Sequence, residues 1–156
     1  MQFALANPGL NATIFDLPTS QPFAERVVGA AGLAGRVAFV GGDFTEDELP
    51  GGFDVAWLSH ILHGEGPATC RAIIVKAARA LEPGGLLLVH EFILDDSRTS
   101  PQFAALFSLN MLAGTAEGRS YSLSELSAML AGAGARDVRL LPFTGPTESR
   151  VLAATV

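Results

Sequence analysis

The sequence contains one cysteine, one lysine and no apolar run of the roughly 20 residues that a membrane-spanning helix needs. The single cysteine, Cys70, cannot form an internal disulfide, which is typical of a protein in a reducing cytoplasm. The net charge is −6 and no basic run occurs, so we expect neither nucleic acid nor an anionic membrane as a partner. Because the first eight residues also carry no basic leader segment, the chain is expected to be soluble and cytoplasmic.

A further absence concerns glycine. No glycine-rich turn from a strand into a helix precedes Asp16, and the dinucleotide-binding pattern G-x-G-x-x-G is missing, so a nicotinamide-binding protein is disfavoured. What is present is a composition of 49% hydrophobic and 17% charged residues over 156 positions, which is enough for a substantial core. We therefore expect one domain that spans residues 1–156.

Polar side chains follow two apolar runs that read as neighbouring strands. The run at 53–58 is followed by Ser59, His60 and His63, and the run at 86–89 is followed by His90 and Glu91. In open parallel sheets ligands bind at the carboxyl ends of the strands, so a histidine and a carboxylate delivered there are placed for proton transfer.

Strand and helix patterns alternate along the chain, which predicts an α/β sandwich with a mostly parallel sheet. The last two runs, 136–141 and 150–156, flank a Gly-Pro turn and indicate an antiparallel hairpin. The continuous apolar run at 86–89 predicts helices on both faces of the sheet. Further strands are expected at 12–15 and 37–40. Helices are expected at 1–6, from Pro22 onward, from Pro67 to Leu81, and from Pro101 onward, and the third of these is expected to stop at the glycine turn at 83–85. A last helix is expected to begin at a capping box formed by Ser122 and Glu125.

The same periodicity predicts which side chains form the core. In the helix that starts at Pro22, Phe23, Val27 and Val28 are expected to be buried. Cys70 and Trp57 are also expected in the core, and burial would make Cys70 an unreactive thiol.

Six short strings, in this order and spacing, resemble the catalytic domain of S-adenosylmethionine-dependent O-methyltransferases. The resemblance is to the group that acts on hydroxyls of plant phenolics and of bacterial polyketide, carotenoid and other aromatic metabolites, and it covers almost the whole chain. It implies a Rossmann-like methyltransferase fold and transfer of a methyl group from S-adenosylmethionine to a hydroxyl of a small aromatic or polyketide-like acceptor, with S-adenosylhomocysteine as product. The strings are IFDLP at 14–18, GDF at 42–44, SHILH at 59–63, LEPGG at 81–85, HEF at 90–92 and GRSY at 118–121.

The family's first strand and its glycine-rich loop, D-x-G-x-G-x-G, have no counterpart here. Residues 1–8 match the end of the helix that follows that loop, so the chain resembles a truncated catalytic domain. The missing strand would lie between the strands at 12–15 and 53–58, which leaves two strand edges unpaired or forces them together. Because unpaired edges invite pairing with another chain, we expect a homo-oligomer, a strand-swapped arrangement, or a chain that is a fragment of a longer protein.

The resemblance also implies roles for individual residues. His63 matches the general base that removes the acceptor's proton, with Glu91 and Glu117 as flanking carboxylates. The cofactor-binding residues are expected to be Asp16 and Leu17 at the ribose, Asp43 and Phe44 at the adenine, and Ser59 and His60. The acceptor-binding residues are expected to be Phe103, Phe107, Asn110 and Met111 on one helix. Asn110 is informative because a polar group on that apolar face requires a polar partner.

Other interpretations remain for the same residues. The chain could be a non-catalytic Rossmann-like remnant that serves as a dimerisation or regulatory module with inherited site residues. His60, His63, His90 and Glu91 could instead bind a metal, since imidazole and carboxylate are ordinary zinc ligands, but their spacing matches no known zinc motif and no metal is expected. Where the family has His-Asp-Trp, His63 is followed by Gly64-Glu65-Gly66, which removes an aromatic side chain from the pocket. Arg119 and Tyr121 either close a loop over the pocket or belong to a solvated loop.

Overall fold

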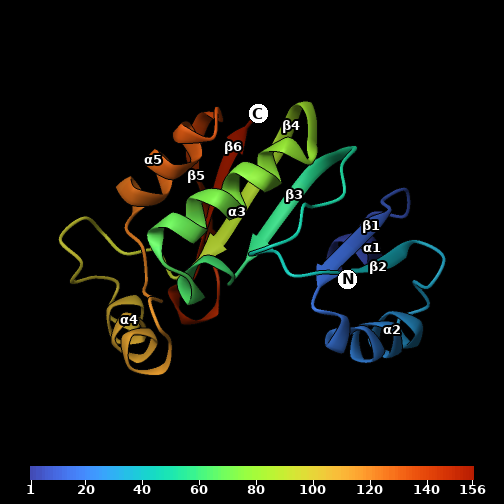
Figure 1. Cartoon of the computed structure of the whole chain (residues 1–156), viewed down its shortest axis with the longest axis horizontal. Coiled ribbons are helices and arrows are strands. Elements are labelled where there is room, and N and C mark those ends of the chain that lie inside the picture. Colours follow the sequence, from blue (N-terminus) through green and yellow to red (C-terminus); the bar gives the residue numbers. More distant parts are fainter. The chain divides into compact units, whose positions relative to one another are not determined.

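The computed structural model describes residues 1–156, which form two compact units, 1–49 and 50–156 (Figure 1). The prediction that residues 1–156 form one domain stays a prediction. None of the helices combines the length and the apolar character that crossing a bilayer requires.

The first unit is a parallel strand pair covered by a helix. Its elements are α1 (Gln2–Ala6), β1 (Ala12–Asp16), a 3₁₀ turn (Pro18–Ser20), α2 (Gln21–Ala30) and β2 (Val37–Gly41). β1 and β2 pair in register from Ala12 opposite Val37 to Asp16 opposite Gly41. A small core, made of Ala4, Val28, Leu33 and Val37, holds the unit together.

The prediction for α2 is wrong at two of its three apolar positions. Val28 is buried, but Phe23 and Val27 have exposed fractions of 62% and 44%. Only two strands lie under this helix, so they cover one narrow stripe of its surface. A side chain needs a neighbour on the sheet to be buried, and the periodicity of a helix alone does not supply one.

The second unit is a four-stranded mixed sheet with helices. Its elements are β3 (Phe53–Ser59), a 3₁₀ turn (Leu62–Gly64), α3 (Pro67–Arg79), β4 (Leu81–Glu91), α4 (Gln102–Gly114), α5 (Leu123–Gly132), β5 (Arg136–Thr144), a 3₁₀ turn (Pro146–Glu148) and β6 (Arg150–Thr155). The strand order is β3-β4-β6-β5. β3 and β4 are parallel, whereas β6 is antiparallel to both β4 and β5. The predicted α/β fold with an antiparallel C-terminal hairpin is confirmed.

β4 begins earlier than predicted. Leu81 belongs to this strand, where it pairs with Phe53, while α3 ends at Arg79. The glycine turn expected to stop the helix lies within β4, because Gly84 N donates to Val156 O and Val156 N donates to Gly85 O. Val156 thus bonds residues 84 and 85 into the sheet, although their sequence by itself resembles the end of a helix.

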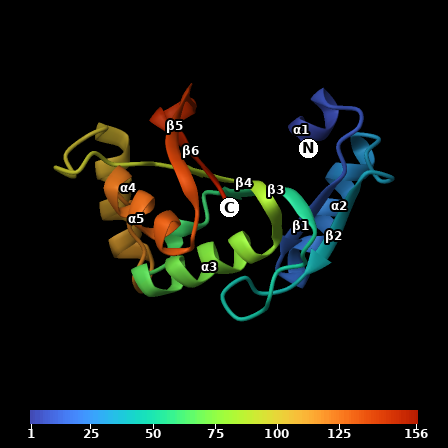
Figure 2. The same ribbon diagram turned by 90° about the horizontal axis from the view of Figure 1, so that it is seen from above.

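The two faces of this sheet differ in burial. α3 and α5 lie on the same side of it (Figure 2). Leu87 and Val89 of β4 are fully buried, whereas Val55 and Trp57 of β3 have exposed fractions of 50% and 37%. The predictions that Trp57 lies in the core and that helices cover both faces are therefore wrong for this unit. β1 and β3 each pair with a strand on one side only, so the two predicted edges are left unpaired.

Candidate functional site

The carboxyl ends of β3 and β4 lie side by side because the two strands are parallel and in register, with Ser59 opposite His90. After Ser59 the chain turns sharply at His60, whose φ of 56° is in the left-handed region. His60 N donates to His90 O at 2.9 Å, which extends the ladder by one bond. Leu62, which is fully buried, then fixes the 3₁₀ turn that carries His63.

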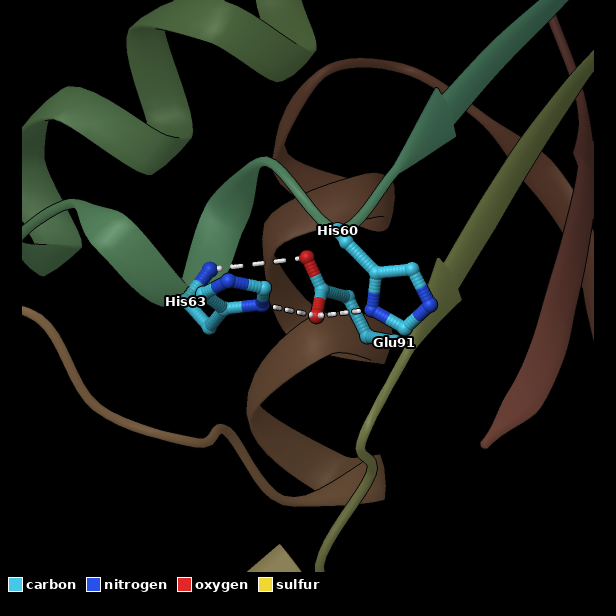
Figure 3. Close-up of side chains that lie close together, drawn as sticks. All are labelled: His60, His63 and Glu91. Atoms are coloured by element: carbon cyan, nitrogen blue, oxygen red, sulfur yellow. Dashed lines mark hydrogen bonds and ion pairs between the residues drawn. The ribbon is translucent and has the colours of Figure 1, made fainter. Parts of the chain in front are cut away.

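Glu91 and His63 form a hydrogen-bonded pair at these strand ends (Figure 3). His63 Nδ1 lies 2.7 Å from Glu91 Oε2. The other carboxylate oxygen, Oε1, accepts from Leu62 N at 2.9 Å and from His63 N at 3.4 Å. The backbone thus fixes the carboxylate, and the carboxylate fixes the ring: an ionised acceptor at Nδ1 keeps the imidazole proton there and leaves Nε2 as the basic nitrogen.

The ionisation of Glu91 results from two opposing effects. Glu91 has an exposed fraction of 4%, and burial acts to raise its pKa. Contacts with His60 and His63 outweigh this effect and hold the pKa of Glu91 below its ordinary value. Glu91 is therefore a carboxylate at neutral pH.

His60 lies on the other side of the same carboxylate. Its Nδ1 is 3.8 Å from Glu91 Oε2, and this buried nitrogen has no hydrogen-bond partner. Its ring packs on Phe92 with centroids 4.6 Å apart, and edge-on to His90 at 4.4 Å.

His90 is held between two serines. Its Nδ1 lies 3.0 Å from Ser59 Oγ, and its Nε2 lies 3.0 Å from Ser149 Oγ. Burial, followed by the nearby His60, lowers the pKa of His90. Ser59 is therefore engaged with His90, and both ring nitrogens of His90 are occupied.

Aromatic side chains surround His63. Phe107 of α4 meets the His63 ring edge-on with centroids 4.8 Å apart, and Phe103 stacks on Phe107 at 6.0 Å. Phe92 belongs to the same group of rings, with its centroid 4.6 Å from that of Phe107 and 6.1 Å from that of His63. Phe92 is not among the predicted site residues, although its place directly after Glu91, at the end of a strand, is a usable signal.

The two other predicted acceptor-binding residues of α4 are Asn110 and Met111. Asn110 is exposed and Met111 is half-buried. α4 also exposes Leu106, Leu109 and Leu112, and the assignment of Asn110 to the acceptor pocket stays a prediction. The helix buries only Ala104 fully and has apolar side chains around its whole circumference.

The loop before α5 is anchored to the His63 segment. Arg119 N donates to His63 O at 2.9 Å, and Tyr121 OH donates to Glu65 O at 2.5 Å. Tyr121 is buried, so it is part of the anchor and not of a solvated loop. Glu117 is exposed, lies against Gly66 and makes no hydrogen bond or ion pair with His63.

Two further strand ends, in the first unit, carry the predicted nucleoside-binding acids. Asp16 ends β1, and its Oδ1 accepts from Leu17 N at 2.7 Å. Gly42 N donates to Asp16 O, which brings Asp43 to the same edge, where its Oδ1 accepts from Thr45 N at 2.8 Å. Gly42 is required here because a Cβ would collide with the Phe15 ring. Phe44 is half-buried and Leu17 is exposed.

Residues 2–136 match the O-methyltransferase domain family. The chain belongs to this family. It is 42% identical over 141 residues to the tetracenomycin polyketide synthesis 8-O-methyl transferase TcmO of Streptomyces glaucescens, a match that covers 90% of this chain and 41% of TcmO. The chain thus spans about two fifths of this relative's length.

Solved structures of O-methyltransferases agree with this assignment. A family 2 O-methyltransferase of Planctomyces limnophilus, in complex with apigenin, superimposes with a TM-score of 0.90 at 30% identity, covering 98% of this chain and 45% of that one. PigF with S-adenosylhomocysteine, a protein of Serratia, also gives a TM-score of 0.90, at 31% identity, covering 100% of this chain and 46% of that one. The family assignment is therefore supported by sequence and by fold.

Proposed function

We propose that the chain is the catalytic part of an S-adenosylmethionine-dependent O-methyltransferase in which His63 is the general base. The observation that carries the proposal is the His63–Glu91 pair, with 2.7 Å between Nδ1 and Oε2. A buried carboxylate beside an imidazole fixes the tautomer with a basic Nε2 and stabilises the imidazolium that forms when Nε2 accepts a proton.

This geometry supports the following proton transfer. S-adenosylmethionine, when bound, supplies an electrophilic methyl group on a sulfonium. His63 Nε2 accepts the proton of the acceptor hydroxyl as the oxygen takes the methyl group, and Glu91 balances the charge on the ring. The products are a methyl ether, S-adenosylhomocysteine and a proton that His63 later releases to water. Alignment of the reacting atoms supplies most of the rate enhancement in such a reaction.

The first unit carries polar and aromatic groups that suit the nucleoside part of the cofactor. Asp16 Oδ2 makes no hydrogen bond within the chain, so this oxygen is available to the hydroxyls of a ribose. Asp43 and Phe44 follow the neighbouring strand, where a carboxylate and an aromatic ring suit an adenine amino group and ring face. We assign Asp16, with Leu17 beside it, to the ribose and Asp43 with Phe44 to the adenine.

The acceptor we propose is a flat, hydroxylated aromatic or polyketide-like molecule. Phe107 contacts the His63 ring, and Phe92 and Phe103 contact Phe107, so this group of rings offers faces and edges to such a molecule. The relatives named above, one of polyketide synthesis and one bound to apigenin, are consistent with this class.

Self-association is the second part of the proposal. β1 and β3 each have one unpaired edge, and β3 also exposes Val55 and Trp57 on its open face. Unpaired edges with apolar side chains favour pairing with strands of a second copy, and a strand-swapped homo-oligomer would satisfy both edges.

Calorimetric titration with S-adenosylhomocysteine tests the cofactor assignment on this chain. We expect binding that is lost or strongly weakened in Asp16→Ala and kept in Asp54→Ala, which removes an exposed carboxylate of β3 outside the site. Absence of heat at millimolar ligand would overturn the enzymatic proposal for this chain and favour the alternative, a non-catalytic module.

Transfer of labelled methyl from S-adenosylmethionine to a panel of phenols tests the base. His63→Ala should lower the rate about 100- to 10,000-fold, the usual contribution of a general base, and leave S-adenosylhomocysteine affinity unchanged. Glu91→Gln should lower kcat more than it raises KM. Parallel loss of cofactor affinity and rate in His63→Ala would show that His63 is structural.

A further inference from the structure

We infer that His60, His63 and Glu91 form a binding site for a divalent transition-metal ion of the zinc type. One potential ligand atom from each of these residues lies within 4.8 Å of the other two. Figure 3 shows the two imidazoles on either side of the Glu91 carboxylate, each with its Nδ1 toward Oε2. Two histidines and one carboxylate are an established ligand set for zinc, with the fourth position open to water or another ligand.

His60 supplies the first independent argument. Its Nδ1 is buried and lacks a hydrogen-bond partner, although it lies only 3.8 Å from a carboxylate oxygen. Its backbone is held at a φ of 56°, which is unfavourable for a residue with a side chain. A buried nitrogen without a hydrogen bond, on a residue whose backbone is in the left-handed region, is costly unless it has a function, and binding of a cation would satisfy it.

The distances suit a small ion. Tetrahedral zinc with bonds of 2.0–2.1 Å places its ligand atoms about 3.3 Å apart. The two measured separations from Glu91 Oε2, 2.7 Å to His63 Nδ1 and 3.8 Å to His60 Nδ1, lie on either side of this value.

The surroundings support the carboxylate as a ligand. Glu91 Oε1 already accepts from Leu62 N at 2.9 Å, so Oε2 is held toward the histidines. Such outer hydrogen bonds orient metal ligands in known sites.

Competing ligands are few. The chain has three histidines and one cysteine. The third histidine, His90, has both ring nitrogens at 3.0 Å from serine hydroxyls. Cys70 is fully buried and donates its thiol hydrogen to Leu62 O at 3.2 Å. Imidazole nitrogen also favours zinc, copper or nickel over magnesium and calcium.

A bound metal would change the chemistry of His63, a consequence that rests on the proposed function. Metal at Nδ1 leaves the imidazole proton on Nε2, so Nε2 can donate but not accept. The metal-bound chain would therefore lack its base, and zinc would inhibit methyl transfer reversibly.

Calorimetric titration of the full chain with ZnCl₂ tests the site. We expect one zinc ion per chain, with affinity lowered at least about 10- to 100-fold in His60→Gln and in His63→Gln. His90→Gln is the matched control and should bind zinc as the unaltered chain does. Circular dichroism of each variant checks that it is folded.

A second measurement needs no variant. Cobalt(II) bound in a tetrahedral site with nitrogen ligands gives intense visible absorption bands, and zinc should displace them. Absence of these bands and of zinc binding would overturn the proposal, as would unchanged binding in His60→Gln or its loss in His90→Gln. Zinc binding without inhibition of methyl transfer would support the metal site and overturn the assignment of His63 as the base.

Discussion

Cys70 shows how the surroundings of one side chain set its chemistry. It lies on the buried face of α3, donates its thiol hydrogen to Leu62 O and contacts Tyr121 OH at 3.4 Å. Burial, the largest effect, raises the pKa of this thiol to about 11. At pH 8 roughly one molecule in a thousand would carry the thiolate, which is the reactive form.

We therefore expect Cys70 to react very slowly with iodoacetamide in the folded chain and rapidly once denaturant exposes it. Mass spectrometry of samples taken at intervals measures both rates. Rapid labelling of the native chain would show that the helix opens or that the thiol is not buried.

Asp95, a half-buried loop residue, illustrates the opposite shift. Its carboxylate accepts from the hydroxyls of Ser97 and Ser100 and from the N–H groups of Thr99 and Ser100. These bonds lower the pKa of Asp95 from 3.8 to about 2, and the hydroxyls of Ser97 and Ser100 have the largest effects. The unfolded chain then binds more protons than the folded one between these two values, so this contribution to stability falls as pH drops.

The matching variant is Asp95→Asn. It should have a lower melting temperature than the unaltered chain above pH 4, and the difference should shrink between pH 3.8 and 2. Thermal melts at pH 7, 3 and 2 measure this difference. A difference that is constant over this range would mean that the charge of Asp95 does not stabilise the loop.

At the scale of the element, α5 begins with a complete capping box. Ser122 Oγ accepts from Glu125 N at 3.3 Å, and Glu125 Oε2 accepts from Ser122 N at 2.9 Å. Ser122→Ala removes one half of this exchange and should lower the free energy of unfolding by about 1 kcal/mol. Urea denaturation followed by circular dichroism measures it.

Ser127 is the control within the same helix. Its hydroxyl donates to Leu123 O inside the helix, a bond that contributes little to stability. Ser127→Ala should change the free energy of unfolding by less than about 0.5 kcal/mol. Equal effects of the two variants would show that the cap does not determine stability.

Sequence alone predicted the elements whose signals are local. The capping box, the start of α3 at Pro67 and the C-terminal hairpin depend on neighbouring residues, and all three are confirmed. The start of β4 was not predictable in this way, because Leu81 pairs with Phe53 and the following glycines bond to Val156 at the far end of the chain. The exposure of Trp57 likewise depends on which segments cover its face of the sheet.

The same distinction holds for the candidate site. Parallel strands end at one edge, so the approach of His63 to Glu91 followed from the order of the elements. The unusual backbone of His60 and the contact of His90 with Ser149 depend on turns and distant segments, and no pattern in the sequence indicated them.

At the scale of the whole molecule, the open face of β3 makes association testable. Val55→Lys places a charge on this face, where the native side chain is half exposed, and should shift sedimentation velocity profiles toward the monomer. Leu106→Lys, an exposed position on α4, is the control and should leave the profile unchanged. Equal effects of both variants, or a monomer without either, would contradict association through β3.

The exposed position of Trp57 has a practical consequence. It is the only tryptophan of the chain, and its ring lies 5.3 Å from that of His90, next to the histidine cluster. Ultraviolet emission from this indole therefore comes from one known place. The fluorescence of Trp57 in an unlabelled sample can therefore report the binding of ligands at the ends of β3 and β4.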